Sequence, residues 1–332
     1  TEATEARLSG EPEHPRQDFR ELAAALGARI VSFSDLRTHG GFSDRLVARL
    51  FGRGTALALY AFRQGGTFYF TTAENAGFPL ACLLKCRPHA RHVMIGHRIS
   101  AGKKRLVAKW LKLFKRVDHM LCYTREQVRY AADYLGVPEA RMHRIDFHVD
   151  ADFYTPAPDG RGNGIVSVGR ELRDYPTLFE AVADTDIPVT VVASSPWSRR
   201  ADQTRNREIP ANVTLKTGLS YGELRDLYRN CAAVVVPLQN VDSPAGVTSI
   251  LEAQAVGKPV IVSATPGIAD SIEPGVTAKT VPCGDPAALR KAIQEILGDD
   301  AERERLGQAG REAVLAGKTL DHYVSRICAI CR

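Results

Sequence analysis

The sequence contains no apolar run long enough to span a bilayer, and it does not open with the pattern of a secretory signal. These absences argue against an integral membrane protein and against a secreted one. We therefore expect a cytoplasmic protein that reaches the inner membrane face, if at all, only as a peripheral protein. Residues 1–19 are polar, which predicts a disordered tail.

Cysteine is sparse and scattered. The 332 residues include seven cysteines, of which Cys328 and Cys331 have CxxC spacing without a second pair or an adjacent histidine. This arrangement favours buried thiols in a reducing compartment over a disulfide framework or a zinc site. We expect no bound metal from the cysteines.

The net charge of +6 is concentrated in one segment, where residues 103–116 carry basic side chains and no acid. Apolar residues recur there at helical spacing, and Trp110 is one of them. The pattern fits a basic amphipathic helix lying on anionic lipid, and it also fits a helix that packs on the core and turns its lysines to water. Nucleic acid is not an expected partner, because no recognisable binding motif accompanies the charge.

Hydrophobic residues make up 44% of the chain and charged residues 25%, which is typical of a soluble globular protein of two domains. Apolar strands alternate with helical patterns in both halves, which predicts an α/β fold with two doubly wound parallel sheets. A short strand is expected at 29–33, and 56–62 is ambiguous between helix and strand. The Pro- and Gly-containing stretch 152–163 predicts an interdomain linker, so we place the domains at 20–155 and 156–317.

The stretch from Pro237 to Asp270 predicts a strand end, a loop, a helix from near Gly246 and a second strand. Backbone N–H groups of Gly246, Val247 and Thr248 would meet a phosphate at the positive end of the helix. Glu252, one turn later, could accept hydrogen bonds from sugar hydroxyls. Together they would describe a nucleotide site, although a helix cap and a surface glutamate would give the same residues.

Gly169 and Arg170 follow the first strand of the second half, and Arg173 comes three residues later. Glycine permits the tight turn that aims Arg170 at a ligand. Two guanidinium groups over one loop suit a diphosphate, which accepts paired donors. A pair of surface arginines would give the same pattern.

The segment that begins at Gly246, GVTSILEAQAVGKPVIVS, resembles the donor-site signature of the GT-B glycosyltransferases of retaining family 4. The resemblance covers roughly 65–330. It implies two Rossmann-like domains facing across a cleft, with residues 318–332 packing back on the first domain. Members carry two glutamates around this loop. The second matches Glu252, whereas the first falls near Ser243 or Pro244, and Asp242 is the nearest acid. We assign Asp242 and Ser243 to the donor site on this basis.

Two residues of the first domain are candidates for the acceptor side. His97 follows an apolar strand, and members of the family often place a histidine at the matching point; it could bond a sugar hydroxyl or a developing charge. Glu74 lies between a strand and a helix and could orient or deprotonate an acceptor hydroxyl. The simpler interpretations are a capping histidine and a glutamate at a helix N-terminus. We take His97, Glu74 and Arg170 as the catalytic candidates.

The resemblance implies an enzyme that moves a sugar from a nucleotide-diphosphate sugar, UDP-sugar before GDP-sugar, to a hydroxyl acceptor with retention. No cofactor is expected, and Asp184–Asp186 and Asp150–Asp152, which look like the metal motif of another glycosyltransferase fold, lie in the wrong places to serve it. Three further functions stay open at this point. They are a membrane-surface enzyme with a lipid-linked acceptor, a nucleotide-sugar epimerase, and a catalytically silent nucleotide-binding protein.

Overall fold

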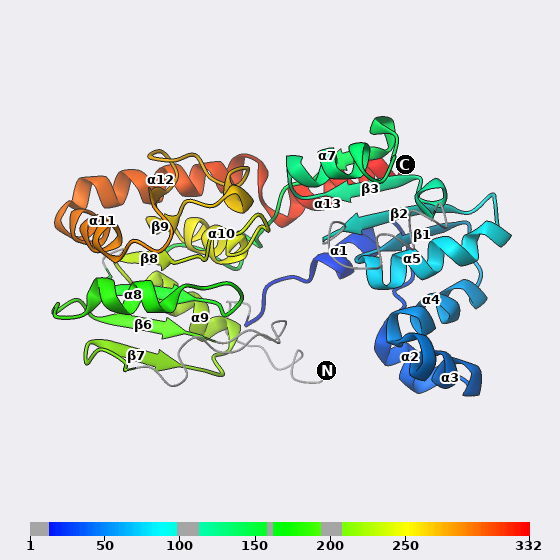
Figure 1. The fold of residues 1–332 in the computed structure, drawn as a ribbon, viewed down its shortest axis with the longest axis horizontal. Coiled ribbons are helices and arrows are strands. Elements are labelled where there is room, and N and C mark those ends of the chain that lie inside the picture. Colours follow the sequence, from blue (N-terminus) through cyan, green and yellow to red (C-terminus); the bar gives the residue numbers. More distant parts are fainter. Residues whose placement is uncertain (1–12, 98–112, 158–161, 194–207) are drawn as a thin grey trace. The chain divides into compact units, whose positions relative to one another are not determined.

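The computed structural model describes residues 13–97, 113–157, 162–193 and 208–332. The chain forms two compact units (Figure 1). The N-terminal unit contains Gln17–Asp146 and Val324–Arg332, and the C-terminal unit contains Thr1–Arg16 and Phe147–Tyr323.

The N-terminal unit is built on a parallel sheet whose described strands follow the order β1–β2–β3–β4. Its last residues belong to α13 (Leu320–Cys331), which begins in the other unit. Short 3-10 turns join the main elements at Leu84–Cys86, Leu113–Arg116 and Glu139–Arg141. The strands and helices are β1 (Phe68–Thr71), β2 (Arg91–Gly96), β3 (His119–Cys122), β4 (Met142–Arg144), α1 (Asp18–Ala25), α2 (Phe33–His39), α3 (Phe42–Phe51), α4 (Arg53–Arg63), α5 (Glu74–Leu83) and α7 (Arg125–Asp133).

The strand expected at 29–33 is wrong. Phe33 begins α2 instead, because Ser32 caps this helix: its hydroxyl accepts from the Asp35 N–H, and the Asp35 carboxylate accepts from the Ser32 N–H at 2.7 Å. This local capping box competes with strand pairing and prevails. The ambiguous segment 56–62 lies in α4. No strand precedes β1 in the part of the chain that the structure describes.

The C-terminal unit carries a second parallel sheet, in which the described strands follow the order β10–β9–β8–β5–β6–β7. The chain enters this sheet in the middle at β5, winds outward to β7, and returns to β8 on the other side of β5. This doubly wound order opens a crevice at the carboxyl ends of β5 and β8, where such sheets bind ligands. The elements are β5 (Ile165–Val168), β6 (Val189–Val192), β7 (Val213–Lys216), β8 (Ala233–Val236), β9 (Val260–Ser263), β10 (Lys279–Val281), α8 (Tyr175–Val182), α9 (Tyr221–Arg229), α10 (Val247–Ala255), α11 (Pro286–Gly298) and α12 (Asp300–Gly317).

Both faces of this second sheet are covered, which explains its continuous apolar strands. Val234 and Val236 of β8 pack in one core cluster with Ile250 of α10. Val235, between them, points to the opposite face and packs with Leu178 of α8 and Ile293 of α11. The alternation of the strand directs successive side chains to different helices, so the position of α10 at β8 is fixed by buried apolar contacts.

Arg16, within the segment expected to be a disordered tail, is held in place by carboxylates of the C-terminal unit. Its guanidinium donates to Asp150 at 2.9 Å, Asp152 at 2.8 Å and Asp321 at 2.9 Å. The backbone N–H of Arg16 also donates to Asp150 at 2.7 Å. Asp150 is almost fully buried, so this cation offsets the cost of taking its charge out of water. Residues 1–12 lie outside the described part of the chain.

Most of the basic segment 103–116 also lies outside the described residues, since only 113–116 are placed. Among the described helices, none combines the length and the hydropathy that crossing a bilayer requires.

Candidate functional site

The carboxyl ends of β5 and β8 gather most of the residues that the sequence proposes for a donor site. Gly169 and Arg170 follow β5 directly, and the loop after β8 leads through Asp242 and Ser243 into α10. The residues expected from separate stretches of sequence therefore share one edge of one sheet.

Gly246 makes the start of α10 possible. Its φ is +82°, a left-handed conformation that glycine adopts without strain. A Cβ at this position would lie 2.9 Å from Val236 Cγ1, so a larger residue would also displace the core. The helix has no side-chain cap. The first N–H groups, from Val247 onwards, point away from the helix without intrahelical partners, which leaves them for an anion.

The two residues after Gly246 differ in exposure. Val247 is buried in the core under the helix, whereas Thr248 is exposed. A ligand at this helix tip would therefore meet backbone amides and the Thr248 hydroxyl, while Val247 contributes its N–H and holds the turn by apolar packing.

The turn after β5 is shaped by Gly169, whose φ is +110°. Its N–H donates to Val192 O at 3.0 Å, and its carbonyl accepts from the Tyr175 hydroxyl. Arg170 follows, half-buried, and its Nε is enclosed without a hydrogen-bond partner among the described residues. A buried guanidinium N–H without a partner is costly, and a bound anion would satisfy it.

Arg173 lies deeper than the sequence suggests, with only 4% of its surface exposed. Its guanidinium donates to Val168 O at 3.0 Å, to Glu171 O at 3.1 Å and to Ser249 Oγ at 3.1 Å. Burial lowers its pKa from the usual range. These bonds brace the turn after β5 against the first turn of α10. The geometry thus gives Arg173 a positioning role, and its contact with a diphosphate stays a prediction.

Glu252 is held by two tyrosines that the sequence does not single out. The Tyr154 hydroxyl donates to Oε1 at 3.0 Å and the Tyr228 hydroxyl donates to Oε2 at 3.0 Å. Burial raises the pKa of Glu252 to about 7, and the two hydroxyls and nearby Arg173 oppose the rise. Each oxygen keeps a further lone pair for a ligand hydroxyl. The tyrosines fix the orientation of the carboxylate, and its contact with a ribose stays a prediction.

Backbone hydrogen bonds hold the loop that contains Asp242 and Ser243. The Gly267 N–H donates to Val241 O at 3.3 Å, and the Ala245 N–H donates to Ser243 O at 2.7 Å. Gly267 passes so close to Ser243 O that any Cβ there would collide with it. Asp242 is exposed and Ser243 is half-buried, so the acid remains accessible to a ligand beside the helix start.

In the N-terminal unit, Glu74 and His97 lie at the carboxyl ends of the paired strands β1 and β2. The His97 Nε2 is 2.9 Å from Thr72 O, and the His97 carbonyl accepts from Gln127 Nε2 at 2.9 Å. The imidazole also lies 5.2 Å from the Tyr123 ring, centroid to centroid. Glu74 is the first residue of α5. The structure therefore brings these two residues to one edge, with the exposed imidazole anchored there.

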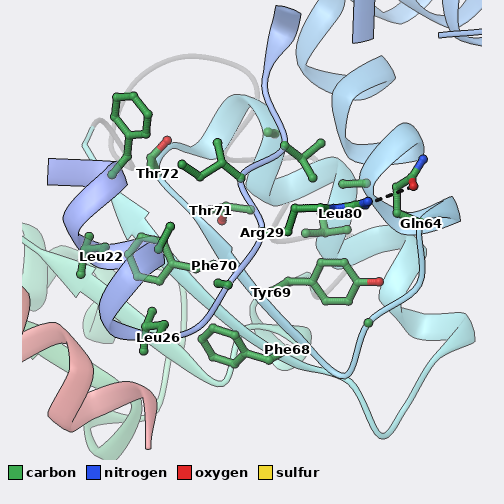
Figure 2. A pocket seen from close by; sticks show the side chains of 18 of the residues that line it. Leu22, Leu26, Arg29, Gln64, Phe68, Tyr69, Phe70, Thr71, Thr72 and Leu80 are labelled. Atoms are coloured by element: carbon green, nitrogen blue, oxygen red, sulfur yellow. Dashed lines mark hydrogen bonds between the residues drawn. The ribbon is translucent and has the colours of Figure 1, made fainter. Parts of the chain in front are cut away.

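A cavity of about 470 Å³ lies along the outer edge of β1. Figure 2 shows Leu22 and Leu26 of α1 on the same side of β1 as Phe68 and Phe70, and Arg29 bonded to Gln64. The lining ends at Thr72, whose carbonyl contacts His97. Its volume is in the range of small-molecule sites. The cavity was not foreseen, because the residues that form it come from distant stretches.

The described residues hold no cluster of three or more side chains suited to a metal ion. Asp150 and Asp152 are both bonded to Arg16. Asp184, in the turn before β6, lies at the amino end of the sheet. Asp184 is therefore at the sheet end opposite to the edge that carries the candidate site.

A family model described as glycosyl transferases group 1 matches residues 157–313. The D-inositol 3-phosphate glycosyltransferase 1 of Catenulispora acidiphila is 32% identical over 287 residues, which cover 78% of this chain and 68% of that protein. The alpha-maltose-1-phosphate synthase of Mycobacterium tuberculosis is 32% identical over 179 residues, but the match spans only 44% of its length.

Solved structures share the fold. A sucrose-phosphate synthase from Thermosynechococcus elongatus has a TM-score of 0.69 at 22% identity, covering 86% of this chain and 78% of its own. Anabaena HepE, solved with UDP and glucose, has a TM-score of 0.71 at 13% identity, covering 96% of this chain and 97% of its own. Both are glycosyltransferase-type folds with two parallel-sheet domains, which confirms the expected GT-B class.

Proposed function

The chain belongs to the group 1 glycosyltransferases, and we propose that it transfers a sugar from a UDP-sugar to a hydroxyl acceptor, with retention of configuration and without a metal. The observation that carries the donor assignment is the Nε of Arg170, which has no partner among the described residues and lies on the turn after β5, at the edge where the uncapped α10 begins. The two features supply a cation and backbone donors at one edge of one sheet.

The diphosphate would lie between Arg170 and the amides of 246–248. A guanidinium donates two hydrogen bonds to phosphate oxygens, and the helix N-terminus adds partial positive charge. The bracing bonds of Arg173 keep the turn and the helix start together. As the bond to the sugar breaks, negative charge grows on the departing diphosphate, and these fixed donors would stabilise it without rearrangement.

Glu252 would bind a diol of the donor one turn along α10. Its carboxylate is pre-oriented by Tyr154 and Tyr228, so a ligand hydroxyl meets an acceptor whose position is already set. Because the pKa of Glu252 is about 7, the ionised form that accepts most strongly is populated above neutral pH. Asp242 is the nearest exposed acid on the loop before α10, and we assign it to the sugar.

The acceptor would bind the N-terminal unit at the edge marked by Glu74 and His97. Because the His97 Nε2–H faces the Thr72 carbonyl, the Nδ1 of the neutral ring can accept a hydrogen bond from an acceptor hydroxyl. The apolar cavity that ends at Thr72 adds a place for a nonpolar part of the acceptor. This supports an acceptor with a nonpolar group, and with it an enzyme that works at a membrane surface on a lipid-linked acceptor. An epimerase or a catalytically silent protein would need no such place.

The test is a nucleotide panel followed by product analysis. UDP should raise the melting temperature more than GDP or ADP, because a ligand that binds only the folded state stabilises it. UDP-sugars with candidate acceptors should then yield a product of unchanged anomeric configuration by NMR, with equal rates in EDTA. A new sugar formed from donor alone would show an epimerase, and binding without UDP release in any mixture would show a silent homologue. A rate abolished by EDTA would refute metal independence.

A further inference from the structure

Helix α3 presents an apolar stripe to solvent at one end of the N-terminal unit. Phe42 is 81% exposed, Leu46 46% and Leu50 63%. They are spaced four residues apart and therefore follow one side of the helix. Phe51 at its end is 70% exposed. Adjacent aromatic and leucine side chains are rarely left in water on this scale without a partner.

The opposite side of α3 explains why this stripe faces outward. Asp44 is buried and pairs with Arg63 of α4, and its carboxylate accepts from the Gly41 N–H at 2.9 Å. This anchoring turns the Asp44 side toward α4 and the Phe42 side away from it. Figure 1 shows α2 and α3 grouped beside α4, away from the strands. The apolar stripe is therefore the outward face of a helix that is anchored to α4 by its opposite side.

Exposed basic side chains predominate around the stripe. Arg37, Arg45, Arg49 and Arg53 are exposed and make no ion pair with a described residue. The acids of residues 33–53 are engaged: Asp44 with Arg63, and Asp35 with Ser32 in the cap of α2. The surface that remains is apolar in the middle and cationic at its sides.

We propose that α3 docks the N-terminal unit on an anionic phospholipid bilayer. The apolar stripe would enter the boundary between headgroups and acyl chains, while the arginines would extend to phosphate oxygens at its sides. A second copy of this chain fits less well, because pairing two such faces would bring the arginines of both copies together. This surface is distinct in sequence from segment 103–116, and the proposal does not depend on the proposed transfer reaction.

The first measurement is co-sedimentation with vesicles of phosphatidylcholine containing phosphatidylglycerol, and with vesicles of phosphatidylcholine alone. The full chain should bind the anionic vesicles, and binding should weaken as salt rises. Two variants test the two halves of the surface: Phe42→Ser with Leu50→Ser, and Arg45→Glu with Arg49→Glu. Each should reduce the partition coefficient roughly tenfold or more, because surface arginines and buried apolar area both contribute to binding.

Matched controls separate this site from general effects. Leu315→Ser removes an exposed leucine from α12, and Lys216→Glu with Lys291→Glu makes the same change of charge on the other unit. Both should bind vesicles like the unaltered chain. Thermal unfolding should show that all variants are folded, which is expected because the replaced side chains are exposed.

Four outcomes would overturn the proposal. The chain could fail to bind anionic vesicles, or bind them equally well with the α3 variants. It could lose binding only with Lys103→Glu, Lys104→Glu and Arg105→Glu, which would place the contact in the other basic segment. Finally, sedimentation velocity without lipid could reveal a dimer that the α3 variants dissociate, which would make a second copy the occupant of this face.

Discussion

One histidine should lower the free energy of unfolding of the N-terminal unit by about 3 kcal/mol when the pH falls from 7 to 4. The cause is His92, a fully buried residue in the middle of the first sheet. Its Nε2 is 2.9 Å from Thr71 Oγ1, and its backbone N–H donates to Asp118 at 2.7 Å. Burial lowers the pKa of His92 to about 4, because the charged imidazole would lose its hydration.

The direction follows from proton binding in the two states. Between pH 6.5 and pH 4 the unfolded chain binds a proton at this histidine and the folded chain does not, so stability rises with pH through that window. The contribution of His92 to stability is fully present above the pKa of the unfolded state and is lost as the pH falls toward 4. Glu252, in the C-terminal unit, has the opposite sign: its pKa is raised from 4.5 to about 7, so that unit should lose stability as pH rises through this range.

Urea unfolding at pH 7, 5.5 and 4, followed by amide hydrogen exchange in each unit, would measure both trends. His92→Gln keeps a hydrogen-bonding side chain and cannot titrate, so it should remove about 3 kcal/mol of the loss at low pH from the N-terminal unit. His322→Gln, which changes an exposed histidine of α13, is the matched control and should keep it. An unchanged pH dependence in His92→Gln would show that other groups cause the loss.

Arg170→Ala should lower kcat/KM for glycosyl transfer by on the order of 10²- to 10³-fold, since one fixed donor at a developing anion has about that effect. Stability should change little, because the Nε of Arg170 makes no hydrogen bond with the described residues. Most of the loss should appear in kcat if the contact strengthens as the diphosphate departs.

Two further variants identify the cause of that loss. Arg170→Lys retains the charge without the paired donors and should recover only part of the activity. Arg305→Ala removes an arginine from α12, where it bonds Glu302 and Gly275 O, and should be active. Activity of Arg170→Ala within about threefold of the unaltered enzyme would place the diphosphate elsewhere and contradict the donor site.

Sequence patterns predicted the second half of the fold well, because its strands are buried on both faces and its helices carry local signals. The unit from β8 through α10 to β9 has continuous apolar strands and a glycine at each end of the helix, Gly246 and Gly257, both with positive φ. The pattern was weaker at 29–33, where the apolar residues suggest a strand. There the capping box of Ser32 and Asp35 starts a helix. Whether a capping box prevails over strand pairing depends on long-range contacts.

The sequence indicated where the candidate residues lie along the strands and helices, and it indicated only part of their environment. Glycine and arginine types located the turn after β5, but nothing local distinguishes the braced Arg173 from Arg170, whose Nε has no partner among the described residues. Tyr154 and Tyr228 were missed, because they reach Glu252 from 98 and 24 residues away. Contacts over such separations depend on how the sheet is wound, and a single sequence records them only as buried aromatic residues.

The outer edge of β1 has a consequence for handling the protein. This strand, Phe-Tyr-Phe-Thr, ends the described order of the first sheet, and the cavity separates it from α1 and the segment 28–31. An aromatic strand edge is a template on which other chains can add strands and aggregate. Residues 18–31 therefore shield an aggregation-prone strand edge. A shortened protein that begins after residue 31 would expose this edge. Solubility of this enzyme would then depend on a segment that contributes no strand to the sheet.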